Sequence, residues 1–154
     1  MKIDMIILGI ASIWGLYWTL RNQHILSGLV TLGLIGGIIL AFLNLYDSSF
    51  AGVVVFLISA GIALLYALFY KKFSIHKRVV IILIIVPTML YWIFLINHLP
   101  GAHMLWYSLF LPFIALIYGL TYPVNLKNEW GFVIILLAEA FTHIYPVLLN
   151  LKLT

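Results

Sequence analysis

Residues 79–125 read VVIILIIVPTMLYWIFLINHLPGAHMLWYSLFLPFIALIYGLTYPVN and contain no Asp, Glu, Lys or Arg. A helix needs about 20 mostly apolar residues to cross the roughly 30 Å hydrocarbon core of a bilayer. This stretch is much longer than one such helix, and Pro100 and Gly101 favour a turn near its middle. The stretch therefore predicts two membrane-spanning helices joined by a short connection.

The rest of the chain extends this pattern to a predicted all-α integral membrane protein. Helices are favoured over a β-barrel because the apolar segments are continuous and do not alternate with polar residues. Because the first segment is the shortest, a bundle of five spans is the alternative to six. The chain 1–154 is predicted to be a single transmembrane domain with no soluble domain. The six predicted spans are 5–20, 25–46, 50–70, 79–96, 104–122 and 130–149.

Composition excludes several functional classes. The chain is 66% hydrophobic and 8% charged, whereas a soluble domain is about 25% charged. Soluble, disordered and nucleic-acid-binding proteins are therefore excluded, and the lipid bilayer is the expected partner. The chain has no cysteine, and no serine stands in a recognisable nucleophile motif, so a non-enzymatic role is favoured.

The distribution of Lys and Arg predicts the orientation in the membrane, because cytoplasmic loops carry an excess of these residues. Six basic residues fall at one end of the predicted bundle, and only Lys2 and Lys152 fall at the other. We therefore expect a multi-pass protein of a bacterial cytoplasmic (inner) membrane with both termini outside. The six residues expected inside are Arg21, Lys71, Lys72, Lys77, Arg78 and Lys127.

Two segments suggest an internal repeat. Residues 17–24 and 91–98 both read Tyr-Trp, five residues, His, at an offset of 74 residues. Halves of three spans each have opposite topology, so the pattern would mark a 3+3 inverted repeat of the kind found in transporters. Three identities also arise by chance, which is the alternative explanation.

Small residues predict where helices pack most closely in lipid. The second span places Gly33, Gly37 and Ala41 on one face, and the third span carries a similar stripe that includes Ser59. The fifth span carries such a stripe around Pro112, which is also expected to kink the helix. Close packing of these three spans is therefore predicted.

The sharpest feature of the sequence is Glu139, in the middle of the last span. An ionised carboxylate at the bilayer centre costs about 2.5 kcal/mol or more, so Glu139 is expected to be protonated or paired with a histidine. His143 follows four residues later, on the same helix face. With Thr142 and Asn150 it forms a polar stripe that leads outward. This stripe handles a proton or small ligand in one interpretation, and locks the helix to a neighbour in the other.

Other polar residues gather at the predicted outer face. They are Asn44 and Asp47 after the second span, and His98 and His103 beside the turn between the fourth and fifth spans. The outer end of the last span is expected to approach this turn, because its polar stripe should avoid lipid. If His98, His103 and His143 converge, they form a metal site or ligate haem. No cofactor is otherwise expected, and spacing does not single out this site.

The turn His98-Leu99-Pro100-Gly101-Ala102 resembles the His-Trp-Pro-Gly-Ala turn of small inner-membrane proteins of Bacteroidetes type, typified by the membrane subunit of the gliding-motility and type 9 secretion motor. In that family the motif joins two membrane helices, and Leu99 here replaces its tryptophan. The family's membrane glutamate follows in the next helix, where this chain has no acidic residue. The resemblance therefore implies a Bacteroidetes-like source and a turn between two membrane helices. It does not imply the motor function.

Three functional hypotheses follow. The leading one is a transporter or channel-like protein whose Glu139–His143 stripe handles a proton or small ligand. The second is an accessory subunit of a larger membrane complex, assembled with other membrane subunits or with copies of itself. The third is an intramembrane redox protein that binds haem or metal through its outer histidines.

Overall fold

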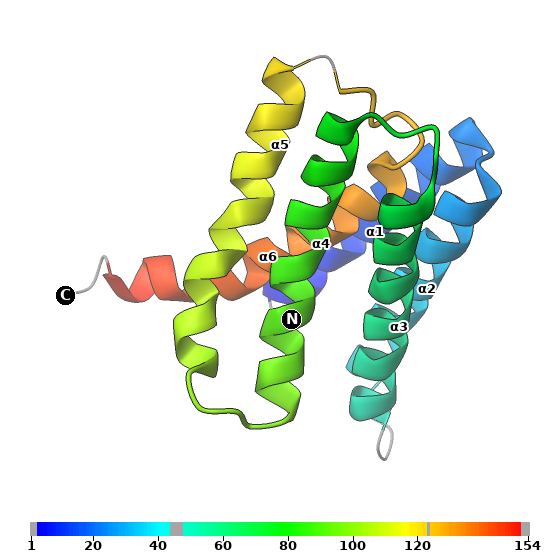
Figure 1. Ribbon diagram of the computed structural model, residues 1–154. Helices are drawn as coiled ribbons and strands as arrows, with labels where there is room; N and C mark the ends of the chain where they lie inside the picture. The colour runs from blue at the N-terminus through cyan, green and yellow to red at the C-terminus, as the bar shows by residue number, and fades with distance from the viewer. Residues whose placement is uncertain (1–2, 44–47, 123, 152–154) are drawn as a thin grey trace.

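A computed structural model describes residues 3–43, 48–122 and 124–151, and these residues contain helices and no strand (Figure 1). The predicted all-helical architecture is confirmed. Within the described residues, six helical segments are each long and apolar enough to cross a membrane. The helices are α1 (Ile3–Asn22), α2 (Ile25–Phe42), α3 (Ser48–Phe69), α4 (Ile75–Ile96), the 3₁₀ helix η1 (Ala102–Phe110), α5 (Leu111–Thr121) and α6 (Trp130–Leu151).

The fifth predicted span is built differently from the expected continuous α-helix. Its first half is the 3₁₀ helix η1, and α5 begins only at Leu111. At the junction of η1 and α5, Pro112 has no N–H to donate to the carbonyl of Ser108 as an α-helix requires. That carbonyl instead accepts from Leu111, one residue earlier, which is the 3₁₀ pattern. The helix type thus changes beside Pro112, while α4 runs continuously through Pro87.

Two helix pairs approach each other through glycine. At the α2–α3 contact, a Cβ added to Gly37 would lie 2.8 Å from the carbonyl oxygen of Gly52. At the α1–α6 contact, a Cβ on Gly15 would lie 2.5 Å from the carbonyl oxygen of Gly131. The stripe predicted on the second span therefore does pack closely against the third. The glycine contact between the first and last helices was not predicted.

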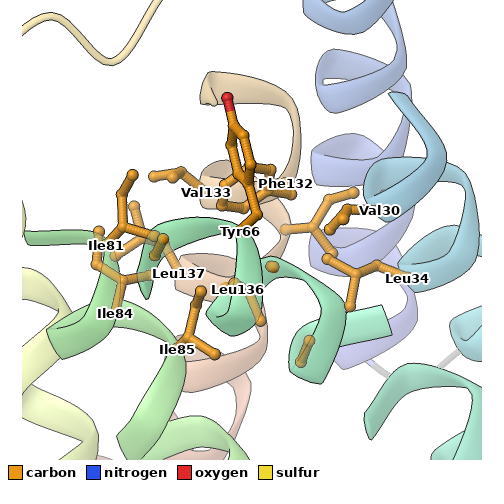
Figure 2. Packing of buried hydrophobic residues seen from close by; sticks show 14 of the residues in the cluster. Val30, Leu34, Tyr66, Ile81, Ile84, Ile85, Phe132, Val133, Leu136 and Leu137 are labelled. Carbon is orange, nitrogen blue, oxygen red and sulfur yellow. The ribbon is translucent and has the colours of Figure 1, made fainter. Parts of the chain in front are cut away.

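The helices are arranged so that the two ends of the bundle differ. The α3–α4 and α5–α6 connections lie at the top of Figure 1. The end of α2, the beginning of α3 and the turn after α4 lie at the bottom. The α6 helix, which packs along α1, is the most buried of the candidate spans. The main apolar core lies toward the top, where α6 meets residues of α2, α3 and α4 (Figure 2).

The helix packing does not repeat between the two halves of the chain. In a 3+3 inverted repeat, the α2–α3 contact would have its counterpart in α5 and α6. The α2–α3 pair packs along its length, whereas the fifth span contacts α6 much less, and mainly through η1. The two Tyr-Trp motifs also differ, because Trp18 lies beneath the Arg21 guanidinium and Trp92 bonds to Glu139. The packing thus gives the predicted repeat no support.

Candidate functional site

Glu139 lies in the middle of α6, and only 4% of its surface is exposed. Its Oε1 atom lies 3.0 Å from Nε2 of His143, one helical turn later. The same oxygen accepts a hydrogen bond of 2.9 Å from Nε1 of Trp92 on α4. The expected pairing with His143 therefore occurs, and Trp92 is an additional partner that joins α6 to α4.

Aromatic rings of α4 hold His143 in place. The centroid of its ring lies 4.6 Å from that of Tyr91 and 5.2 Å from that of Trp92. Because the imidazole is enclosed by these rings and bonded to Glu139, its orientation is fixed from two helices. The buried carboxylate is therefore preorganised by a side chain of its own helix and by one from α4.

A cavity of about 770 Å³ opens beside Glu139. It lies between the beginnings of α1 and α3 and the ends of α2 and α4, with the second half of α6 as a further wall. Of these segments, the ends of α2 and α4 and the beginning of α3 lie at the bottom of Figure 1, away from the α3–α4 connection. Asp4 and His98 line the cavity together with Glu139 and His143. Sequence analysis missed Asp4, because nothing in the spacing connects the first helix to the last.

The other predicted site residues are placed as follows. Thr142 lines the cavity, but its hydroxyl donates to the backbone carbonyl of Glu139 at 2.8 Å and so is occupied within the helix. His98 lies in the turn after α4 and is exposed. Asn44 and Asp47 lie outside the described residues, as do the side chains of His103 and Asn150. The predicted outward stripe is thus described only from Glu139 to His143.

His98, in the turn after α4, lines the same cavity as His143 in the second half of α6, so this turn approaches α6 as expected. Leu109 of η1 packs in one cluster with Ala140 and Ile144 of α6. Gly101 adopts a left-handed backbone with φ of 89°, which favours glycine at this position of the turn. The resemblance of this turn to the motor-subunit family is not tested by these contacts and stays a prediction.

The metal or haem site also stays a prediction. In the parts of the chain that the structure describes, no group of three or more His, Cys, Asp or Glu side chains is placed to hold a metal ion. His98 and His143 line one cavity, but the side chain of the third predicted ligand, His103, lies outside the described residues.

A second buried carboxylate, at the opposite end of α6, was not predicted as part of any site. Glu129 is fully buried, and its Oε2 lies 2.7 Å from Nζ of Lys77 on α4. Its Oε1 accepts a hydrogen bond of 3.3 Å from the Tyr66 hydroxyl on α3. The Tyr66 oxygen lies 3.5 Å from Nε2 of His24, and Lys77 also lies over the Phe73 ring. We call Glu129, Lys77, Tyr66 and His24 the Glu129 cluster.

The two histidines at this end of the bundle make contacts within the fold. His24 accepts at Nδ1 from the Ser27 amide at the start of α2. His76 lies 2.6 Å from the Tyr118 hydroxyl and stacks on the ring of Tyr122. Both histidine rings therefore make their contacts with residues of the fold itself.

An apolar layer separates the two carboxylates. Glu129 directly precedes α6, and Glu139 follows ten residues later, or about 15 Å along the helix axis. The layer between them contains Phe132, Val133 and Leu136, which pack with Ile81 and neighbouring residues of α4 (Figure 2). In Figure 2 the Tyr66 hydroxyl points away from these apolar side chains. Over the described residues, the cavity beside Glu139 is thus closed toward the Glu129 cluster.

Comparison of the chain with known protein families, with curated proteins and with solved structures finds no match.

Proposed function

We propose that this protein is a small multi-pass membrane transporter in which the Glu139–His143 pair binds a proton or a small ligand from the cavity. The observation that carries the proposal is a buried carboxylate that lines a cavity of about 770 Å³ and is held from two helices. A carboxylate inside a membrane span is costly and is usually retained for a functional reason. A lock between helices alone would not need a cavity beside it.

The two ends of α6 support a transport cycle with alternating access. The cavity lies at one end, whereas the apolar layer and the Glu129–Lys77 ion pair close the other end. In such a cycle the site opens to one side of the membrane at a time. The arrangement corresponds to a state that is open toward the chain termini and closed toward the α3–α4 connection. A continuously open channel fits this packing less well.

The proposed environment is a bacterial inner membrane, with both termini outside. Its support is the number of basic residues near the α1–α2, α3–α4 and α5–α6 connections, at the end away from the cavity. Cytoplasmic loops carry such an excess. In this orientation the cavity faces the outside and the Glu129 cluster faces the cytoplasm.

Proton movement in reconstituted vesicles tests the proposal. The purified protein is placed in liposomes that contain a pH-sensitive dye, and a pH difference is imposed under a clamped membrane potential. Wild type is expected to dissipate the difference faster than protein-free liposomes, and Glu139→Gln is expected to lose this activity. Thr88→Val is the matched control, because Thr88 is fully buried on α4 and its hydroxyl bonds only to its own helix at Ile84.

The accessory-subunit hypothesis predicts a different outcome of the same work. A wild-type protein that moves no protons and copurifies stoichiometrically with another membrane protein would favour it. In that case Glu139→Leu should weaken the assembly, and Glu139→Gln should largely preserve it.

A further inference from the structure

We infer that the cavity is selective for a monovalent organic cation with an apolar body, such as an aryl or alkyl ammonium compound. This inference rests on the proposed function, because it names the class of ligand that the Glu139 site would take. It follows from the charge and the aromatic character of the cavity walls.

The charge of the walls favours a cation. Two carboxylates, from Asp4 and Glu139, line the cavity, and none of the described residues that line it is Lys or Arg. Both hydrogen bonds to the Glu139 carboxylate reach Oε1, and among the described residues no hydrogen bond reaches Oε2. An almost fully buried carboxylate thus keeps one oxygen without a donor beside the cavity. A cation there replaces the missing partner, since buried charges are normally paired.

The apolar and aromatic walls favour an organic cation over a metal ion. Aromatic residues from three helices line the cavity, together with aliphatic side chains such as Leu8, Ile38 and Val53. The faces of aromatic rings attract cations, and quaternary ammonium groups are typically recognised by such rings. A hydrated inorganic ion would gain little from these walls. The aromatic residues are Phe42, Phe50, Phe56, Tyr91 and Trp92.

The histidines are compatible with this charge pattern. A neutral His143 can donate its Nε2–H to Glu139, so the pair needs no positive charge on the imidazole. His98 is at the exposed rim of the cavity. A bound ammonium group would therefore meet the carboxylate as the nearest full charge on the wall.

A matched set of small probes tests the inference. Phenyltrimethylammonium and tert-butylbenzene have the same shape and differ in the charged nitrogen, and benzoate carries the opposite charge. The chain has no cysteine, so Val53→Cys, on the cavity wall, provides a single reporter. The rate of its reaction with a maleimide, in lipid nanodiscs, measures how well each probe occupies the cavity. Glu139→Gln and the control Thr88→Val are added to this background.

We expect phenyltrimethylammonium to protect Val53→Cys at a concentration about tenfold or more below that of the neutral and anionic probes. Glu139→Gln should reduce this preference to within about threefold, and Thr88→Val should retain it. Equal protection by all three probes would overturn the cation assignment and leave ligand binding in place. A preference that survives in Glu139→Gln would overturn the assignment to Glu139. Protection by none of the probes would also overturn the inference. The proposed transport is tested separately, by proton movement in liposomes.

Discussion

The indole Nε1 of Trp92 donates a 2.9 Å hydrogen bond to Oε1 of Glu139, and this bond joins α4 to α6 beside the cavity. Because the acceptor is a buried carboxylate, the bond belongs to the stronger, charge-assisted kind. It holds the Glu139 side chain at the cavity wall, and the Trp92 ring lies against His143. The position of the carboxylate thus depends on α4 as much as on its own helix.

Trp92→Phe removes this donor and keeps an aromatic ring. We expect a loss of about 1–3 kcal/mol in the free energy of unfolding, because a buried acceptor loses a partner. Thermal unfolding in mild detergent measures the change. The control is Trp14→Phe on the exposed face of α1, for which a change within about 0.5 kcal/mol is expected. Equal effects of the two substitutions would show that the Trp92 hydrogen bond contributes little to the free energy of unfolding.

Lys77→Met leaves the buried Glu129 carboxylate without its ion pair. Breaking a buried pair from one side costs about 3–5 kcal/mol, so a strong loss of thermal stability is expected. Lys72→Met, in the exposed loop before α4, should change stability by less than about 0.5 kcal/mol. Adding Glu129→Gln to Lys77→Met should recover part of the loss, because it removes the unpaired charge. A double variant as unstable as the sum of the single variants would contradict the pairing.

Gly131→Ala tests the contact between α1 and α6. The added Cβ would collide with the Thr19 hydroxyl and lie 2.8 Å from that of Thr31. Overpacking of this kind costs about 1–3 kcal/mol, measurable by thermal unfolding. Gly36→Ala is the matched control, since its Cβ would meet nothing within 4 Å. There alanine should stabilise the helix by about 0.5–1 kcal/mol. Tolerance of alanine at Gly131 would contradict the close approach of these helices.

Single cysteines test the orientation in the membrane. Lys72→Cys lies in the α3–α4 loop and Leu99→Cys in the α4–α5 turn, and both positions are exposed. An impermeant maleimide added to intact cells should label Leu99→Cys and not Lys72→Cys, because the basic loops are expected inside. Permeabilised cells, in which both should react, provide the control. The reverse pattern in intact cells would invert the topology.

The features that could be predicted from sequence are those contained within one segment. Continuous apolar runs locate the six helices, and the four-residue spacing brings His143 to Glu139 on one helix. The hydrogen bond from Trp92 and the position of Asp4 on the cavity wall could not be predicted, because they depend on how separate helices pack. The same holds for the pairing of Glu129 with Lys77 and Tyr66.

Pro112 shows a different limit of prediction from sequence. The residue was recognised as a point of disruption, but a kink was expected instead of a change from 3₁₀ to α-helix. A missing N–H is compatible with either result. The choice between them depends on the packing of η1 against α4 and α6, which a single sequence does not specify.

Carbodiimide modification of the two buried glutamates tests the central claim most directly, because Glu129 directly precedes α6 and Glu139 lies within it, so one molecule reports on both. An apolar carbodiimide is added to the folded protein in nanodiscs, and mass spectrometry of its peptides measures the adduct on Glu139 and on Glu129. The account predicts that Glu139, which lines the cavity, is modified and that phenyltrimethylammonium slows this reaction. Glu129, fully buried and paired with Lys77, should remain unmodified. Modification of Glu129 with Glu139 untouched would contradict the placement of the functional site at Glu139.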